Sequence, residues 1–150
     1  MKGFTLIEIL LTLGILAVVS TIGLVSLSNF NKDKALDAEV GKVLSLISKA
    51  RSYTLSAREG SAYGVHFEEK RVVLFKGLTY SSGTATNQIQ ALNAEVKIAN
   101  TSLSGGGNEV LFSRLSGATT QSGTITLTSV RNSSQTKVIT IVGTGIAYSN

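Results

Sequence analysis

The sequence predicts an α+β protein in which one long N-terminal helix packs on antiparallel β-sheet. Three observations lead to this prediction. The run Phe4–Leu27 is apolar apart from one carboxylate, Glu8, and the segment behind it carries apolar residues at helical spacing. After residue 77 the chain is rich in Gly, Ser and Thr between short apolar stretches, which is typical of strands and turns.

The apolar run is long enough to cross a membrane. As a helix, Phe4–Leu27 would span about 36 Å, and a hydrocarbon core is about 30 Å thick. Lys2 precedes the run and charged residues follow it, so the flanking charges favour an orientation only weakly. A secretory signal has a shorter apolar stretch and a cleavage site behind it. We therefore expect residues 4–28 to form a transmembrane and assembly helix.

The helix is expected to continue into a globular domain at residues 29–150. One helical stripe carries the apolar residues of its second half: Leu36, Val40, Val43, Leu44, Ile47 and Ala50. We expect a single helix from Phe4 to about Ala57, ended by Arg58-Glu59-Gly60. Such a length is unusual for a helix of an ordinary globular domain.

The remainder of the domain is expected to be antiparallel sheet, and six short strands also allow two sheets packed face to face. Glu68-Glu69-Lys70 is expected to be a hairpin connection, and GLTYSSGTATNQ and NTSLSGGGN are expected to be loops. The expected strands are 63–67, 71–76, 89–98, 109–114, 123–129 and 137–142, the last continuing through 146–148.

Composition sets limits on function. The chain has 150 residues and a formal charge of +5, with acids and bases scattered along it, so an anionic partner is tolerated but not required. It has no cysteine, which excludes disulfides and thiol chemistry.

No residue pattern indicates catalysis, a cofactor or a metal site. His66 is the only histidine, and nearby Glu68 and Glu69 are more typical of a solvated turn than of metal ligands. The glycines at 105–107 and 143–145 lack the residues or the helix that a phosphate-binding loop requires, so we expect turns there. The sequence therefore predicts a protein that is not an enzyme.

The first residues carry a specific resemblance. MKGFTLIEILLTLGILAVV resembles the N-terminus of type IV pilins and of the pseudopilins of type II secretion. In that family a membrane peptidase cuts a short basic leader after its glycine, and the new N-terminal residue, usually phenylalanine, is N-methylated. A glutamate lies four residues further on. The resemblance implies a leader at 1–3, cleavage between Gly3 and Phe4, methylation of Phe4, and a lollipop-shaped pilin-like fold.

The resemblance also implies how subunits assemble. The Phe4 amine of one subunit would meet the Glu8 carboxylate of a neighbour, and this ion pair would set the register because a buried charge left unpaired is costly. Thr5, Glu8 and Thr12 are spaced to form one polar seam on the helix. The alternative is a carboxylate that reaches the lipid headgroups from the helix end.

A second resemblance concerns the β-rich part. VLFSRLSGATTQSGTITL, with Phe112, Gly117 and Gly123, and ARSYTLSAREGSAYGVHFEEKRVVLF are similar to the β-domain of the minor pseudopilin and of fimbrial minor pilins. The implied function is a structural subunit of the filament. A major pilin is the nearest alternative, although the chain lacks the proline that many major pilins carry.

The implied partners are the prepilin peptidase and methyltransferase, pilin or pseudopilin subunits, and lipid of the bacterial inner membrane. The implied location is a single pass through that membrane, with the globular domain outside the cytoplasm, and then a pilus or pseudopilus. A DNA-binding minor pilin and an anchored domain that never assembles are also compatible with the sequence. For DNA binding the sequence offers only three dispersed cations: Arg114, Arg131 and Lys137.

Overall fold

The computed structural model describes residues 3–150, without the side chains of residues 21–33. In this part of the chain a single α-helix, α1 (Leu6–Leu55, 50 residues), is followed by a short 3-10 turn, η1 (Arg58–Gly60). Strands make up most of the remainder: β1 (Tyr63–Glu68), β2 (Arg71–Lys76), β3 (Gln88–Ala91), β4 (Val96–Leu103), β5 (Glu109–Leu111), β6 (Gly123–Ser129), β7 (Thr136–Ile141) and β8 (Ala147–Ser149).

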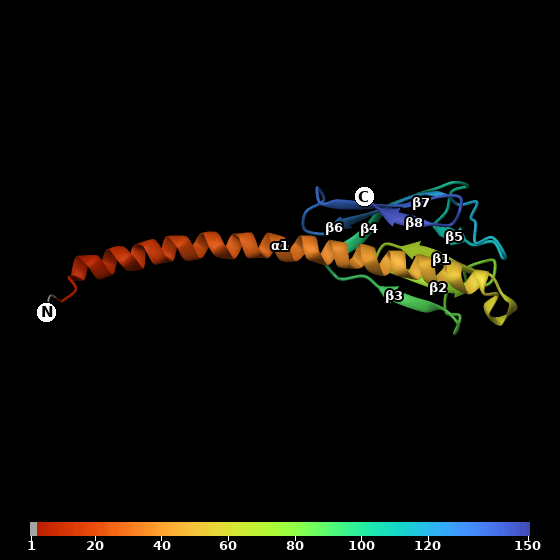
Figure 1. Ribbon diagram of the computed structural model, residues 1–150, viewed down its shortest axis with the longest axis horizontal. Coiled ribbons are helices and arrows are strands. Elements are labelled where there is room, and N and C mark those ends of the chain that lie inside the picture. Colours follow the sequence, from red (N-terminus) through yellow and green to blue (C-terminus); the bar gives the residue numbers. More distant parts are fainter. Residues whose placement is uncertain (1–2) are drawn as a thin grey trace. The chain divides into compact units, whose positions relative to one another are not determined.

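The strands form two four-stranded sheets. Sheet A has the order β3-β2-β1-β5 and sheet B has the order β4-β6-β7-β8 (Figure 1). Every pair of neighbouring strands is antiparallel, which confirms the predicted antiparallel pairing. In sheet A, Glu68 pairs with Arg71 around a tight connection at Glu69 and Lys70, so the predicted hairpin is also confirmed.

The chain divides into two compact units, residues up to 34 and residues 35–150. We call them unit 1 and unit 2. The described part of unit 1 is the short segment 3–5 and the beginning of α1. Unit 2 holds the end of α1 and both sheets.

One hydrophobic core holds unit 2 together. The helix face predicted from the sequence is buried in it, with Val43 and Ala50 fully inaccessible to solvent. Sheet A contributes alternate residues such as Val65, Phe67 and Leu74, because successive side chains of a strand point to opposite faces. Residues of β4, β6 and β7 complete the same cluster: Val96, Ile98, Leu103, Ile125, Leu127, Ile139 and Ile141.

The predicted fold class, a lollipop with a membrane-spanning helix half at 4–28, requires correction. Among the residues that the structure describes, no helix combines the length and apolar character that crossing a membrane requires. Glu8 and the hydroxyls of Thr12 and Ser20 lie among the apolar side chains of residues 6–20. The same finding contradicts the predicted single-pass location in the inner membrane.

Several strand boundaries also differ from the prediction. The expected strand 89–98 is wrong, because β3 and β4 belong to different sheets and a turn separates them, with the Val96 amide donating to the carbonyl of Asn93 at 2.9 Å. NTSLSGGGN is not all loop, since β4 extends to Leu103. The expected continuation of strand 137–142 through 146–148 is a separate strand, β8, behind a turn in which Gly145 has a φ of 77°.

Candidate functional site

The predicted processing site lies in an exposed, non-helical segment. Gly3, Phe4 and Thr5 precede the first residue of α1 and all three are exposed, with Phe4 83% accessible to solvent. Non-helical, exposed chain near a terminus is where proteolysis concentrates. The Gly3–Phe4 bond therefore lies in exposed, non-helical chain.

Glu8 caps the start of α1 together with Thr5, a role that the sequence prediction missed. Its carboxylate Oε2 lies 3.4 Å from both the backbone nitrogen and the hydroxyl of Thr5, and the Thr5 hydroxyl oxygen lies 3.4 Å from the Glu8 nitrogen. These reciprocal contacts form a capping box, in which a Thr before the helix and a Glu three residues later satisfy each other's amides. The spacing Thr-x-x-Glu is the sequence signal that could have revealed it.

The predicted polar seam is only partly formed. Thr5 and Glu8 are in contact, but the Thr12 hydroxyl donates to the carbonyl of Ile9 at 2.9 Å and does not contact Glu8. Among the described residues, no cation lies within ion-pair distance of Glu8. Its negative charge in the first turn of α1 is favoured by the partial positive charge of the helix N-terminus.

Apolar side chains are exposed on all sides of the helix behind this cap. Leu6 is 77% accessible, and every large apolar residue of the described part of unit 1 is more than half exposed: Phe4, Leu6, Ile7, Ile9, Leu10, Leu11, Leu13, Ile15, Leu16, Val18 and Val19. Monomeric soluble proteins rarely expose a continuous apolar surface of this kind, and such surfaces mark contacts with other molecules.

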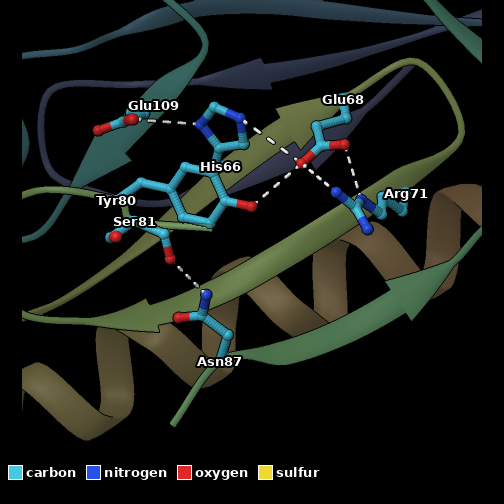
Figure 2. A network of polar contacts seen from close by, with 7 residues as sticks. All are labelled: His66, Glu68, Arg71, Tyr80, Ser81, Asn87 and Glu109. Atoms are coloured by element: carbon cyan, nitrogen blue, oxygen red, sulfur yellow. Dashed lines mark hydrogen bonds and ion pairs between the residues drawn. The ribbon is translucent and has the colours of Figure 1, made fainter. Parts of the chain in front are cut away.

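Unit 2 contains a second cluster of chemically versatile side chains (Figure 2). His66 on β1 has its Nδ1 3.2 Å from Glu109 Oε1 of β5 and its Nε2 3.9 Å from Glu68 Oε1. The ring of Tyr80 stacks on the His66 ring with centroids 3.9 Å apart, and the Tyr80 hydroxyl donates to Glu68 at 3.1 Å. Arg71 binds both oxygens of Glu68, at 2.7 and 3.0 Å.

This network shifts the pKa values of Glu68 and Tyr80 in opposite directions. The hydrogen bond from Arg71 is the main reason why the pKa of Glu68 lies below its ordinary value, and the hydrogen bond from Tyr80 acts in the same direction. Burial, together with the carboxylate of Glu68, raises the pKa of Tyr80. The first shift favours the ionised form of Glu68, and the second favours the protonated form of Tyr80.

The arrangement fits a structural role better than a catalytic one. No group of three His, Cys, Asp or Glu side chains suited to a metal ion is found in the described part of the chain. The tyrosine belongs to the loop between β2 and β3, and the same loop is fixed by Asn87, whose side-chain amide donates to the Ser81 carbonyl at 2.8 Å (Figure 2). The cluster thus ties this loop to the face of sheet A.

The three cations considered for DNA binding do not form an open basic patch. Arg131 is 2.6 Å from Glu95, and Lys137 is 3.1 Å from Asp37, so two of the three are paired with carboxylates of the same chain. Arg114 is exposed on another loop. The two glycine clusters lie in turns, as predicted, and all three glycines at 105–107 have positive φ.

Comparisons with known proteins add no further information. The chain matches no protein-family model, no curated protein and no solved structure.

Proposed function

We propose that the protein is a structural subunit of a type IV filament system, a minor pilin or a type II secretion pseudopilin. It is cleaved between Gly3 and Phe4, N-methylated on Phe4, and assembled through the N-terminal part of α1. One observation carries the proposal: an exposed Gly3–Phe4 bond and the cap formed by Thr5 and Glu8 stand at the start of α1, where the large apolar side chains of residues 6–20 are exposed on every side.

The exposed helix supplies the driving force for assembly. Burying one Leu, Ile, Val or Phe side chain contributes about 1.5–3 kcal/mol. A helix that is apolar all round has no single partner face, so several neighbours are needed to cover it. Packing of identical helices around one another would bury this surface, and repetition of one such contact from copy to copy builds a filament.

Cleavage would place a new charge next to Glu8. The amine of Phe4 would lie one residue before the capping Thr5, at the helix end whose partial charge is also positive. The helix N-terminus disfavours a cation, so the charged amine would be stabilised by a carboxylate that belongs to another helix. The Glu8 side chain of a neighbouring subunit can supply it, and the pair would fix the stagger between copies because breaking it leaves a buried charge.

The capping box makes a sharp test possible. Glu8→Gln keeps an oxygen that can accept the Thr5 amide but removes the charge, whereas Glu8→Ala removes both. We expect neither variant to be found in filaments sheared from cells that carry a type IV filament machinery. Wild type and Glu8→Asp, which keeps the charge, are measured in parallel as controls. If Glu8→Gln assembles like wild type, the carboxylate serves as a helix cap and the ion-pair account is wrong.

The processing enzymes are also expected partners. The proposal requires a peptidase that cuts after Gly3 and a methyltransferase that acts on Phe4, together with further copies or related subunits in the filament. Failure to remove the leader would leave Met1–Gly3 at the position where the amine must pair, so a chain that keeps its leader is expected to remain unassembled.

A further inference from the structure

We propose that the free edge of β3, together with the adjoining face of α1, is a binding site for an extended peptide in which acidic and apolar residues alternate. The peptide would add to sheet A as a further strand. The site lies wholly within unit 2 and does not depend on filament assembly. This proposal can therefore be tested independently of the proposed function.

β3 carries backbone hydrogen-bonding groups on its outer side. β3 ends sheet A, and among the described residues its outer side pairs with no strand. The Leu92 amide donates to the Lys70 carbonyl, and in an antiparallel pair every second residue exchanges such bonds. The register of β3 against β2 then places the amides and carbonyls of Ile89 and Ala91 on the outer side.

The outward carbonyl of Ala91 already accepts a hydrogen bond from a neighbouring side chain. The side-chain amide of Gln90 donates to the Ala91 carbonyl at 3.0 Å. An incoming strand could replace this weak local contact with a backbone amide. The outer edge of β3 therefore presents the donor and acceptor pattern that a strand recognises.

Two of the usual protections against strand addition, charged residues and proline, are missing from this edge. Natural edge strands carry charged residues, proline or bulges that prevent pairing with another chain. No charged residue and no proline occurs between Gly77 and Ala94, and Ile89 is 60% exposed in the middle of β3. The absence of charge and proline from this edge is what a strand that pairs with a partner peptide requires.

A groove beside the edge leaves room for the added strand. It has a volume of about 440 Å³ and lies between α1 and the side of β3 that carries Gln90. The helix side of the groove includes three small residues, Ala38, Gly41 and Ser45, where a strand can approach closely. Figure 1 shows β3 running alongside the corresponding part of α1.

The groove also determines the chemistry of the peptide. Lys42 and Lys49 line it and both are exposed, although Lys42 already binds Glu39 at 2.6 Å, so Lys49 is the stronger attractor. Side chains of an added strand alternate between the two faces of the sheet. Those facing α1 would meet the two lysines and should be acidic, whereas those facing the other way would lie beside Ile89 and Ala91 and should be apolar.

The test uses the 15N-labelled full chain in mild detergent and a capped octapeptide in which valine and glutamate alternate. We expect NMR shift changes and slower hydrogen exchange at the amides of Ile89 and Ala91. The matched octapeptide of valine and lysine should bind at least about tenfold more weakly, because its cations would face Lys42 and Lys49.

Two variants separate the edge from the groove. Ile89→Pro removes one outward amide and keeps the bonds to β2, since proline is tolerated on the open side of an edge strand, and it should weaken binding about tenfold or more. Ile89→Val is its control and should bind like wild type. Lys49→Glu should weaken binding of the acidic peptide even where Ile89→Pro fails to fold.

Three outcomes would overturn the proposal. The first is absence of protection at Ile89 and Ala91 when the acidic peptide is added. The second is equal binding of the acidic and basic peptides. The third is a concentration-dependent change at the same two amides without peptide, which would show that a second copy of the chain occupies the edge.

Discussion

The two ends of helix α1 both carry large apolar residues, but these residues have opposite surroundings. In unit 1, Leu6 is 77% exposed and Val19 is 63% exposed. In unit 2, Val43 on the same helix is completely buried, and so is Ala50. Hydrophobicity alone therefore does not determine burial within one continuous helix.

The difference lies in the polar residues between the apolar ones. In unit 2, polar and charged side chains occupy the helix positions away from the core, so one face packs on the protein's own sheets. In the described part of unit 1 the apolar residues surround the axis and remain exposed. The second end therefore packs in the core of unit 2, whereas the first end leaves an apolar surface exposed.

The largest effect on folding is expected from a charge in the buried end. Val43→Asp should lower the free energy of unfolding of unit 2 by more than about 4 kcal/mol, because an unpaired charge in an apolar core is very costly. Chemical denaturation of the full chain measures this loss. The neighbouring exposed position provides the control, since Ser45→Asp should change little; equal loss in both variants would contradict the assignment of the buried face.

A smaller loss is expected from Gly64→Ala in β1. A Cβ at this position would lie 2.5 Å from Cζ of Phe75 and 2.9 Å from the carbonyl oxygen of Val110. Phe75 is buried and Val110 belongs to the neighbouring strand, so neither can move freely. We expect a loss of about 1–3 kcal/mol, the usual cost of overpacking. Gly41→Ala, on the exposed helix face with open space around it, is the control and should not destabilise.

The Glu68 network should make stability depend on pH. The pKa of Glu68 is lowered mainly by Arg71. The stabilising contribution of the ionised carboxylate is therefore complete above the unfolded-state pKa of about 4.3, and it is lost as the pH falls through the lower pKa of the folded state. Glu68→Gln should be less stable than wild type at neutral pH and lose less stability on acidification. Urea midpoints measured on both proteins from about pH 6 to 2 test this; parallel pH profiles would contradict it.

The smallest effect on folding is expected in the exposed end of the helix. Leu13→Asp should leave the unfolding free energy of unit 2 unchanged within about 0.5 kcal/mol, because Leu13 is exposed and packs on no core residue. The same variant should abolish incorporation into filaments, since its charge would be buried between copies. A large loss of unit 2 stability would show that the two ends do not behave independently.

Much of unit 2 can be predicted from local patterns. The sequence predicts β2 and β6 with their observed bounds, because β2 is a continuous apolar run and β6 alternates threonine with apolar residues, and turn signals flank both. It misses the break between β3 and β4 because the turn at Leu92 to Glu95 contains neither glycine nor proline. Asn93, whose side chain accepts the Glu95 amide at 2.9 Å, is the local signal of that turn.

Contacts between distant residues cannot be read from the sequence. The local pattern around His66 and Glu68 indicates a solvated turn, but Glu109 from β5 and Tyr80 from a loop complete a network around them. Sequence separation hides such partners until the strand order is known. The cap formed by Thr5 and Glu8 is different, because the spacing Thr-x-x-Glu is visible in the sequence. A role of the Glu8 carboxylate in assembly explains the same residue, so the sequence alone did not point to the cap.

The intact mass of the protein isolated from its host tests the central claim most directly. If the exposed Gly3–Phe4 bond is the processing site, the chain will lack Met-Lys-Gly and carry one methyl group on Phe4. Recovery of the full-length chain from assembled filaments would contradict the account, because the amine that should pair with Glu8 of a neighbour would then not exist.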